Sequence, residues 1–151
     1  MILVGGGRKN AGLVYVANLI DALLLVGQPE VGLGRVYNVA DGLDVTWSHF
    51  INALAALLGQ GPVRRSLPRW LAYVAGWSME KWARARRQAS RPLVTRMAVE
   101  LTGTDQGFAS ERVRRELGWR PRVDFATGMG RVQAWLREDG HLDGKDVAAH
   151  P

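Results

Sequence analysis

Few segments of this sequence have the apolar, β-branched character of a strand, and helix-like segments separate them. The candidates are residues 2–4, residues 36–39 and a short extension at Val45. Strands that alternate with helices along a chain typically form a parallel sheet. A sheet of two or three short strands leaves raw edges and apolar surface that something else must cover. The sequence therefore predicts a helix-rich α/β fold that packs against a partner domain or a missing first half.

Apolar residues at helical spacing, together with capping residues, predict helices over most of the remaining chain. The residues of the longest helix that are expected to line one side and pack on the core are Leu71, Val74, Ala75, Ser78 and Trp82. The body of the protein is placed at 1–138, and 139–151 is predicted to be a flexible tail. The expected helices are 18–26, 47–58 after the N-cap Thr46, a long helix opened by Pro68, 94–101, 111–117 after Ser110, and a last helix from Thr127.

The composition excludes several classes of protein. The chain has 151 residues, of which 47% are hydrophobic and 23% charged, as in an ordinary globular domain. It contains no cysteine and three scattered histidines, so neither a disulfide framework nor a metal site is expected. The first apolar run is too short for a signal peptide, and none reaches the ~20 residues of a membrane span. A cytoplasmic protein is expected, with peripheral membrane contact as an additional expectation.

Positive charge is concentrated in the middle of the chain. The net charge is +6, and nine basic residues but a single acid, Glu80, lie between Arg64 and Arg96. Such a basic patch attracts phosphate groups, anionic lipid or nucleic acid. A solvated helix face is the other interpretation, and it is the commoner origin of a charge run.

The N-terminal Met-Ile-Leu-Val-Gly-Gly-Gly segment begins like a dinucleotide-binding loop but departs from its pattern. Gly5 and Gly7 fit the first two positions of G-x-G-x-x-G, whereas Asn10 takes the third. A tight turn ahead of a strand is the better interpretation. A Tyr-x-x-x-Lys pair for proton transfer is also absent, since no tyrosine is followed by lysine four residues later. We therefore expect no catalytic and no cofactor-binding residue in this chain.

Several sequence blocks occur in the order in which extended short-chain dehydrogenases/reductases carry them. Residues 13–22 resemble the block that follows the substrate loop of that family, and residues 34–42 resemble its late Tyr-Asn-Val strand. The Leu-Gly-Trp-x-Pro sequence at 117–121 is similar to the ending of most extended members. Resemblance to the 3β-hydroxysteroid dehydrogenase/sterol-dehydrogenase branch rests on further blocks at 67–80, 92–96 and 105–108.

The resemblance implies a Rossmann-type enzyme with a small C-terminal substrate domain, of which this chain is the C-terminal portion. The dinucleotide-binding half, with its glycine fingerprint and catalytic Tyr-x-x-x-Lys, would lie in a missing N-terminal half or a complementary chain. NAD or NADP is the cofactor that the resemblance implies for the complete family member, and none is expected to bind this chain alone. The chain is therefore expected to be inactive without that partner half.

The substrate that the resemblance implies is a small apolar molecule, steroid-like or lipid-like, whose secondary hydroxyl group is oxidised. Sugar-nucleotide epimerases of the same family hold a diphosphate with arginines at positions that match residues 10–12 and 100–102. Neither stretch contains an arginine here, so a diphosphate would lack charge-assisted hydrogen bonds.

The candidate substrate-binding residues are Tyr15, Asn18, Trp70 and Arg96. Two alternatives stay open beside the steroid-like or lipid-like substrate. One is a fragment of a sugar-nucleotide epimerase or dehydratase. The other is a non-catalytic module that uses the basic patch at 64–96 to bind anionic lipid or, less favoured, nucleic acid.

Overall fold

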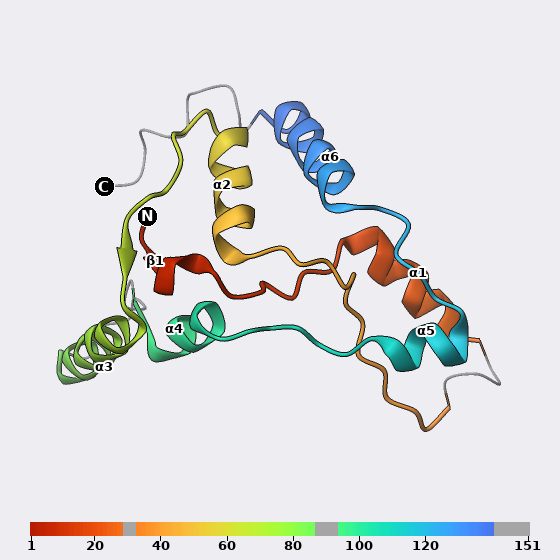
Figure 1. Cartoon of the computed structure of the whole chain (residues 1–151), viewed down its shortest axis with the longest axis horizontal. Coiled ribbons are helices and arrows are strands. Elements are labelled where there is room, and N and C mark those ends of the chain that lie inside the picture. The colour runs from red at the N-terminus through yellow and green to blue at the C-terminus, as the bar shows by residue number, and fades with distance from the viewer. Residues whose placement is uncertain (29–32, 87–93, 141–151) are drawn as a thin grey trace. The chain divides into compact units, whose positions relative to one another are not determined.

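The computed structural model describes residues 1–28, 33–86 and 94–140. In this part of the chain the fold is helix-rich α/β, with two short strands paired in one parallel sheet (Figure 1). The chain forms two compact units, each assembled from three separate stretches. We name them the strand unit, which is Met1–Gly12, Asp44–Asn52 and Gly61–Gly107, and the Trp119 unit, which is Leu13–Leu43, Ala53–Gln60 and Phe108–Pro151.

The sheet of the strand unit joins the N-terminus to a segment far along the chain. Strand β1 (Leu3–Val4) pairs in parallel with strand β2 (Ser66–Leu67). The glycine turn η1 (Gly5–Gly7) follows β1 directly, and the Gly6 amide donates a hydrogen bond to the Ser66 hydroxyl (2.7 Å). The glycines thus form the predicted tight turn, directly after the strand predicted at residues 2–4, but the turn is not followed directly by a further strand.

Helix α3 (Arg69–Ala85) is the longest helix among the described residues, and it packs on helix α4 (Arg96–Gly103) within the strand unit. The residues that α3 buries are all small, namely Ala72, Gly76 and Ala83. Small side chains allow two helix backbones to approach closely. The two helices are therefore held together by close backbone packing.

The inner side of α3 differs from the predicted one. A Cβ atom added to Gly76 would lie 3.0 Å from the backbone nitrogen of Arg96, so this interface has no room for a large side chain. Leu71, Val74 and Trp82 were predicted to line the inner side, and that prediction is wrong, since all three are exposed. Apolar spacing alone did not reveal that the small residues face inward.

Helix α2 (Trp47–Leu57) begins at the predicted residue. The Thr46 hydroxyl accepts a hydrogen bond from the backbone nitrogen of His49 (3.2 Å), which is the bond that an N-cap residue makes. Ile51 is the buried residue of this helix. The helix ends one residue earlier than predicted, a difference within the usual fraying of helix ends.

The Trp119 unit contains helices α1 (Val16–Val26), α5 (Glu111–Leu117) and α6 (Phe125–Glu138). Helix α5 has the predicted bounds and lies beside α1 (Figure 1). Residues from α1, from α5 and from the segment after α5 form the buried core of this unit. They are Ala22, Val113 and Trp119.

The predicted strands at 36–39 and at Val45 are not present in the described residues. A strand needs a neighbouring strand to satisfy its backbone groups, and this part of the chain offers none beside 36–39. Tyr37 and Val39 pack instead against the core of the Trp119 unit. The Val45 carbonyl accepts one hydrogen bond from the Ala11 amide (2.9 Å) without extending into a strand.

Helix α1 begins at Val16, two residues before the predicted start. Helices α4 and α6 also begin at residues other than the predicted ones, because a polar side chain nearby supplies the cap. Asp124 Oδ1 accepts a hydrogen bond from the Thr127 amide (2.7 Å), so α6 begins two residues before Thr127. Thr95 Oγ1 accepts one from the Ala98 amide (3.2 Å) and places the start of α4 after Thr95. Most of the predicted tail, residues 141–151, lies outside the described residues.

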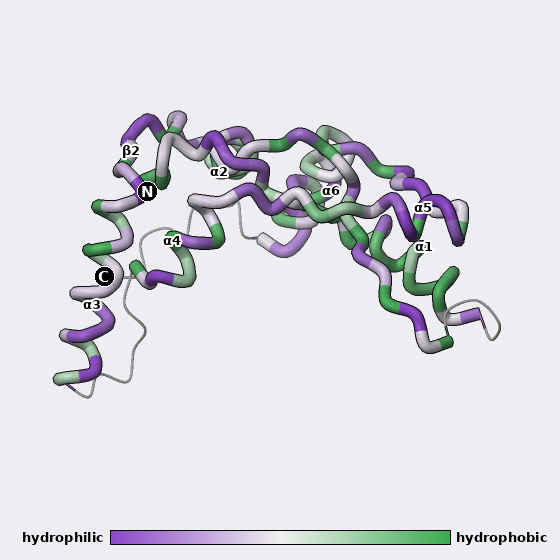
Figure 2. The backbone as a smooth tube through the Cα atoms, turned by 60° about the horizontal axis from the view of Figure 1, so that its bottom comes forward, coloured by the Kyte–Doolittle hydropathy of each residue, from purple (hydrophilic) through white to green (hydrophobic). Residues whose placement is uncertain are grey.

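Hydropathy is unevenly distributed among the helices. Helix α1 is hydrophobic along most of its length, whereas α5 is largely hydrophilic (Figure 2). A helix without a polar face is normally buried on all sides. The exposed side of α1 is therefore a candidate contact surface. Within the described ranges, no helix combines the length and the apolar character that crossing a membrane requires.

Replacement of Gly76 by alanine is expected to destabilise the protein, although alanine is the better helix former. The added methyl group would meet the backbone of Thr95 and Arg96 at 3.0–3.1 Å, and such overpacking typically costs about 1–3 kcal/mol. Gly130→Ala in α6 is the matched control, because nothing lies within 4 Å of its added Cβ. That control should gain up to about 1 kcal/mol from helix propensity. Urea unfolding of both variants measures the difference, and shifts of the same sign would contradict the close packing.

Candidate functional site

Asn18, in the first turn of α1, is the centre of a buried polar network in the Trp119 unit. Its side-chain nitrogen donates to Asp41 Oδ1 (3.0 Å) and to the Val123 carbonyl (2.8 Å). Its side-chain oxygen accepts from the backbone nitrogens of Arg122 and Val123, both at 3.0 Å. These four bonds use the two donors and both lone pairs of a primary amide. A substrate contact would need an accessible atom, and Asn18 has no exposed surface.

The Leu-Gly-Trp-x-Pro segment is fixed to the same network. Gly118 has φ +63°, a left-handed conformation that ends α5 and that glycine adopts without strain. The turn directs Trp119 into the core, where its indole nitrogen donates to the Asn18 carbonyl (3.0 Å). Asp41 completes the network, since its Oδ2 accepts from the Tyr15 amide (2.8 Å). The segment that the sequence analysis identified as a family ending therefore fastens α1 to α5.

Tyr15 lies just before α1 and is partly buried within the Trp119 unit. Its ring packs on Gly128 of α6, where an added Cβ would come within 3.0 Å of the ring. The Arg131 guanidinium lies 6.0 Å from the centre of the ring. Gly128 thus makes room for the aromatic ring between α1 and α6. Substrate contact by Tyr15 stays a prediction.

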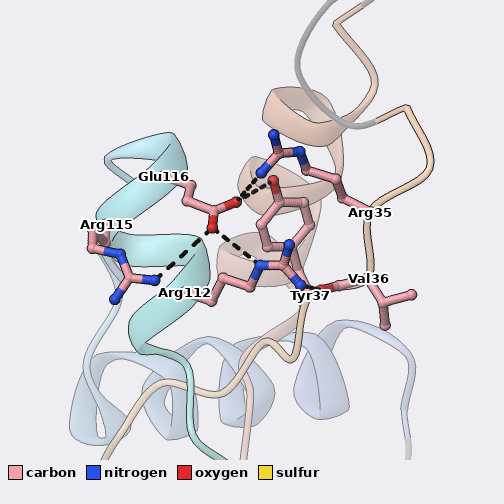
Figure 3. A network of polar contacts seen from close by, with 6 residues as sticks. All are labelled: Arg35, Val36, Tyr37, Arg112, Arg115 and Glu116. Carbon is pink, nitrogen blue, oxygen red and sulfur yellow. Dashed lines mark hydrogen bonds and ion pairs between the residues drawn. The ribbon is translucent and has the colours of Figure 1, made fainter.

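Glu116 of α5 gathers four polar side chains around one carboxylate (Figure 3). Its Oε2 atom accepts hydrogen bonds from the Tyr37 hydroxyl and from Arg35 Nη1, both at 3.0 Å. Its Oε1 atom lies 3.1 Å from Arg112 Nε and 3.9 Å from Arg115 Nη2. The cluster ties the segment before Asp41 to helix α5 and leaves an excess of positive charge there.

Burial and the Glu116 carboxylate disfavour ionisation of the Tyr37 phenol. Partial burial opposes ionisation of Glu116, but the hydrogen bonds from Tyr37 and Arg112 outweigh it and hold the pKa of Glu116 below its ordinary value. Desolvation and the neighbouring carboxylate raise the pKa of the Tyr37 phenol. A catalytic tyrosine base needs the opposite shift, which an adjacent cation provides. The cluster is therefore suited to holding the fold together and not to proton transfer.

Arg96, in the strand unit, is held by one carboxylate. Its backbone nitrogen donates to Glu80 Oε1 (2.8 Å), and its Nε donates to Glu80 Oε2 (2.9 Å). The backbone hydrogen bond from Arg96, followed by the side-chain one, lowers the pKa of Glu80, and the same pairing raises the pKa of Arg96. This bidentate clamp joins α3 to the start of α4. Substrate contact by Arg96 stays a prediction and would have to use its remaining guanidinium nitrogens.

Trp70, at the beginning of α3, is 69% exposed and lies on the helix surface away from α4. It belongs to the strand unit with Arg96, whereas Tyr15 and Asn18 belong to the Trp119 unit. The structure thus brings Tyr15 and Asn18 together at Asp41, whereas Trp70 and Arg96 share a unit without a contact between them. Among residues 1–28, 33–86 and 94–140, no three His, Asp or Glu side chains are placed to hold a metal ion.

A depression of about 500 Å³ lies in the Trp119 unit between α1 and the segment after α5. Leu24, Leu25 and Trp119 provide apolar lining. Asp21 and Arg122 also line it and form an ion pair at 3.7 Å. Its lining is therefore mixed, with Gln28 and Arg120 as further polar residues beside the apolar ones.

The sequence analysis missed an exposed apolar face on α1. The sequence analysis used the apolar spacing of residues 18–26 only to predict a helix. In the structure, the residues that α1 buries are Asn18 and Ala22. The opposite side of the helix carries no charged residue and is 49–68% exposed. Its residues are Val16, Ile20, Leu23 and Leu24. The signal in the sequence is that α1 lacks a polar face, which is unusual for a helix exposed to water.

Comparison with known proteins identifies sequence relatives over most of the chain, although no protein-family model matches it. A farnesyl-dihydroquinoline-oxide ketoreductase of Stigmatella aurantiaca is 31% identical over 83% of the chain. A 2-alkyl-3-oxoalkanoate reductase of Stenotrophomonas maltophilia is 26% identical over 87%. The mouse short-chain dehydrogenase/reductase family 42E member 1 is 28% identical over 91%. The relatives of this chain are therefore short-chain dehydrogenases/reductases.

The chain matches only part of each relative. The chain spans 37%, 41% and 36% of the lengths of these three relatives, in the order given. The crystal structure of gox2253 superimposes on 93% of this chain with a TM-score of 0.64 and 22% sequence identity, and the match covers 40% of that structure. The helix-rich α/β fold therefore agrees with part of a larger protein of known structure.

Replacement of Asn18 by alanine is expected to lower the free energy of unfolding by about 3 kcal/mol or more. The substitution leaves Asp41, the Val123 carbonyl and two backbone nitrogens without their partner, and each unsatisfied buried group costs about 1–3 kcal/mol. Asn52→Ala is the matched control, because its side-chain oxygen accepts a single bond from the Val63 amide (2.8 Å). Urea denaturation compares the two, and equal losses would contradict a central role for Asn18.

The stabilising effect of Glu80 is expected to depend on pH. Since folding lowers the pKa of Glu80, its contribution is full above the ordinary value of 4.5 and is lost as the pH falls through the lower folded value. Glu80→Gln should therefore destabilise at neutral pH, and the difference from the wild type should shrink below pH 4.5. Thermal unfolding across this range measures it. Glu138→Gln, at the exposed end of α6, controls for the loss of one carboxylate, and a pH-independent Glu80 difference would refute the clamp.

Proposed function

We propose that this chain is the C-terminal, substrate-side portion of an NAD(P)-dependent short-chain dehydrogenase/reductase of the 3β-hydroxysteroid dehydrogenase type. The observation that carries the proposal is the exposed apolar face of α1, in a chain whose relatives are more than twice its length. The reaction is the interconversion of a secondary alcohol and a ketone. A hydride moves between the carbinol carbon and the nicotinamide, and the hydroxyl proton moves to or from a base.

The α1 face has the chemistry of a surface that another protein layer covers. Val16, Ile20, Leu23 and Leu24 form a continuous uncharged surface, and burial of each such side chain contributes about 1.5–3 kcal/mol. Exposure of such a face to water is unfavourable. A helix that binds the headgroup region of a membrane typically carries aromatic and basic residues, which the α1 face lacks. The partner that fits is the sheet or helix layer of a dinucleotide-binding half.

That partner supplies the groups that this sequence lacks. No tyrosine in the chain is followed by a lysine four residues later, and burial together with Glu116 raises the pKa of Tyr37. The phenolic base and the glycine loop that binds NAD or NADP therefore belong to the partner half. The described chain contributes the α1 face for assembly and, through Tyr15, an aromatic side chain for the substrate.

The substrate class that we propose is apolar and lipid-like, with a steroid-like ring system included. Two relatives support it, because their names specify a farnesyl-bearing ketone and a 2-alkyl-3-oxoalkanoate. In this chain Arg96 is clamped by Glu80, which leaves it poorly placed to neutralise a diphosphate. The sugar-nucleotide epimerase or dehydratase alternative has no comparable support.

A chimaera tests the proposal directly. The segment of the Stenotrophomonas reductase that matches this chain is replaced by this chain, and reduction of a 2-alkyl-3-oxoalkanoate is followed through nicotinamide absorbance. We expect measurable turnover by the chimaera and no nicotinamide binding by this chain alone. Leu23→Asp should abolish turnover because it places a charge in the interface. A folded but inactive chimaera, beside an active parent enzyme, would overturn the proposal.

The matched control for Leu23→Asp is Leu58→Asp. Leu58 is 50% exposed but lies outside α1, so the same charge should leave turnover within about twofold of the unsubstituted chimaera, as expected for a surface change away from an interface. Equal loss in both variants would show that a new charge disturbs folding and not assembly. Micromolar binding of NAD or NADP by this chain alone would contradict the assignment of the cofactor site to the partner half.

A further inference from the structure

The depression between α1 and the segment after α5 has the size of a ligand-binding cavity. Its volume is about 500 Å³, and small-molecule sites typically enclose about 300–1,000 Å³. Leu24 and Leu25 of α1 line it, together with Leu117 and Trp119 from the end of α5 and the segment that follows. We call this depression the Trp119 pocket. Its apolar lining is suited to covering a hydrocarbon chain.

Positive charge borders this apolar lining. Arg120 and Arg122 both line the Trp119 pocket. Arg122 pairs with Asp21 at 3.7 Å, and because its side chain is 82% exposed this ion pair contributes little to stability. No carboxylate among the described residues lies within ion-pair distance of Arg120. In the described part of the chain, the pocket therefore has two cations against one carboxylate.

The backbone beside the pocket is fixed by internal hydrogen bonds. The Trp119 indole nitrogen donates to the Asn18 carbonyl (3.0 Å). The backbone nitrogens of Arg122 and Val123 donate to Asn18 Oδ1, both at 3.0 Å. These bonds hold the 119–123 segment against α1 near both of its ends. A site whose backbone is already ordered loses little conformational entropy on binding, which favours affinity.

A guanidinium beside an apolar wall matches a small molecule with two parts, a carboxylate and an alkyl chain. A carboxylate can accept two parallel hydrogen bonds from the planar guanidinium, which adds both energy and orientation. An alkyl chain removes the leucine side chains of the wall from water, with a gain for each methylene group buried. A short anion would leave the wall exposed, and a neutral chain would leave Arg120 without a partner. Only a molecule with both parts uses both features of the pocket.

We propose that the Trp119 pocket binds an alkyl carboxylate, whose chain lies on Leu24, Leu25 and Leu117 and whose carboxylate pairs with Arg120. None of the four candidate substrate residues lines the pocket, so this site is separate from the proposed substrate site. It shares only Leu24 with the exposed face of α1, the surface assigned to the partner half. The inference is independent of the proposed oxidoreductase function, because neither cofactor nor partner half enters the argument.

Isothermal titration calorimetry of the 151-residue chain with three probes is the test. Octanoate has both the chain and the charge, 1-octanol has the chain alone, and acetate has the charge alone. We expect 1-octanol to bind at least about tenfold more weakly than octanoate, because it forms no hydrogen bond between two charged groups. Acetate should bind at least about a hundredfold more weakly, because it has no chain to bury.

Two substitutions separate the parts of the site. Arg120→Gln removes the charge, so it should weaken octanoate binding at least about tenfold and leave 1-octanol binding within about twofold. Leu24→Ser removes part of the apolar wall, so it should weaken the binding of both molecules about threefold or more. Leu24 is 68% exposed, and its replacement is therefore not expected to disturb the core.

Matched controls lie on the same chain outside the pocket. Arg137 in the last turn of α6 and Leu58 just after α2 are both exposed, and neither lines the pocket. Arg137→Gln and Leu58→Ser should therefore leave octanoate binding within about twofold of the wild type, as expected of surface changes away from the contact. Circular dichroism confirms that every variant keeps its helices.

Three results would overturn the proposal. One is the absence of octanoate binding at millimolar concentration. Another is equal affinity for octanoate and 1-octanol, which would show that apolar contact alone is responsible. The third is equal weakening of octanoate binding by Arg120→Gln and Arg137→Gln, which would assign the attraction to the general positive charge of the chain.

Discussion

A single side-chain amide, that of Asn18, holds the Trp119 unit together. Its four hydrogen bonds reach Asp41 on one side and the backbone of Arg122 and Val123 on the other, and the backbone carbonyl of the same residue accepts a hydrogen bond from the indole nitrogen of Trp119. Asp41, Val123 and Trp119 are buried, so their hydrogen bonds to Asn18 take the place of hydrogen bonds to water. The position of α1, and with it the exposed face of that helix, follows from this one residue.

Two helices, α1 and α3, expose apolar faces of different chemistry. The face of α1 is aliphatic and without charge, whereas the face of α3 combines aromatic rings with cations. Hydrophobic burial is non-directional, whereas a cation placed over a ring adds an electrostatic attraction. The described chain therefore carries two exposed helix faces of different chemistry, and composition alone does not separate them.

Local signals in the sequence were sufficient to predict where the helices lie. They were insufficient to predict which side of each helix is buried. Thr46 makes the N-cap bond predicted for it, and Gly118 adopts the left-handed conformation expected of a helix end, because both depend on neighbouring residues. The buried face of α3 depends on how near α4 lies at Gly76, and no local pattern encodes that distance. The stretch at 36–39 has strand-like residues but finds no partner strand in the described chain. Asn18 was a substrate candidate because it lies in the family block at 13–22, and the resemblance did not reveal that all four of its side-chain hydrogen bonds are internal.

The hydrogen bond between Asn18 and Val123 joins residues that are 105 positions apart. A ribosome adds roughly 5–20 residues per second, so the partner of that amide is made roughly 5–20 s after the amide itself. During this interval the apolar side chains of α1 have no native core to pack against, and the Asn18 amide can only bond to water. The order of synthesis thus leaves the first helix of the Trp119 unit open to non-native apolar contacts until the C-terminal part of the chain has been made.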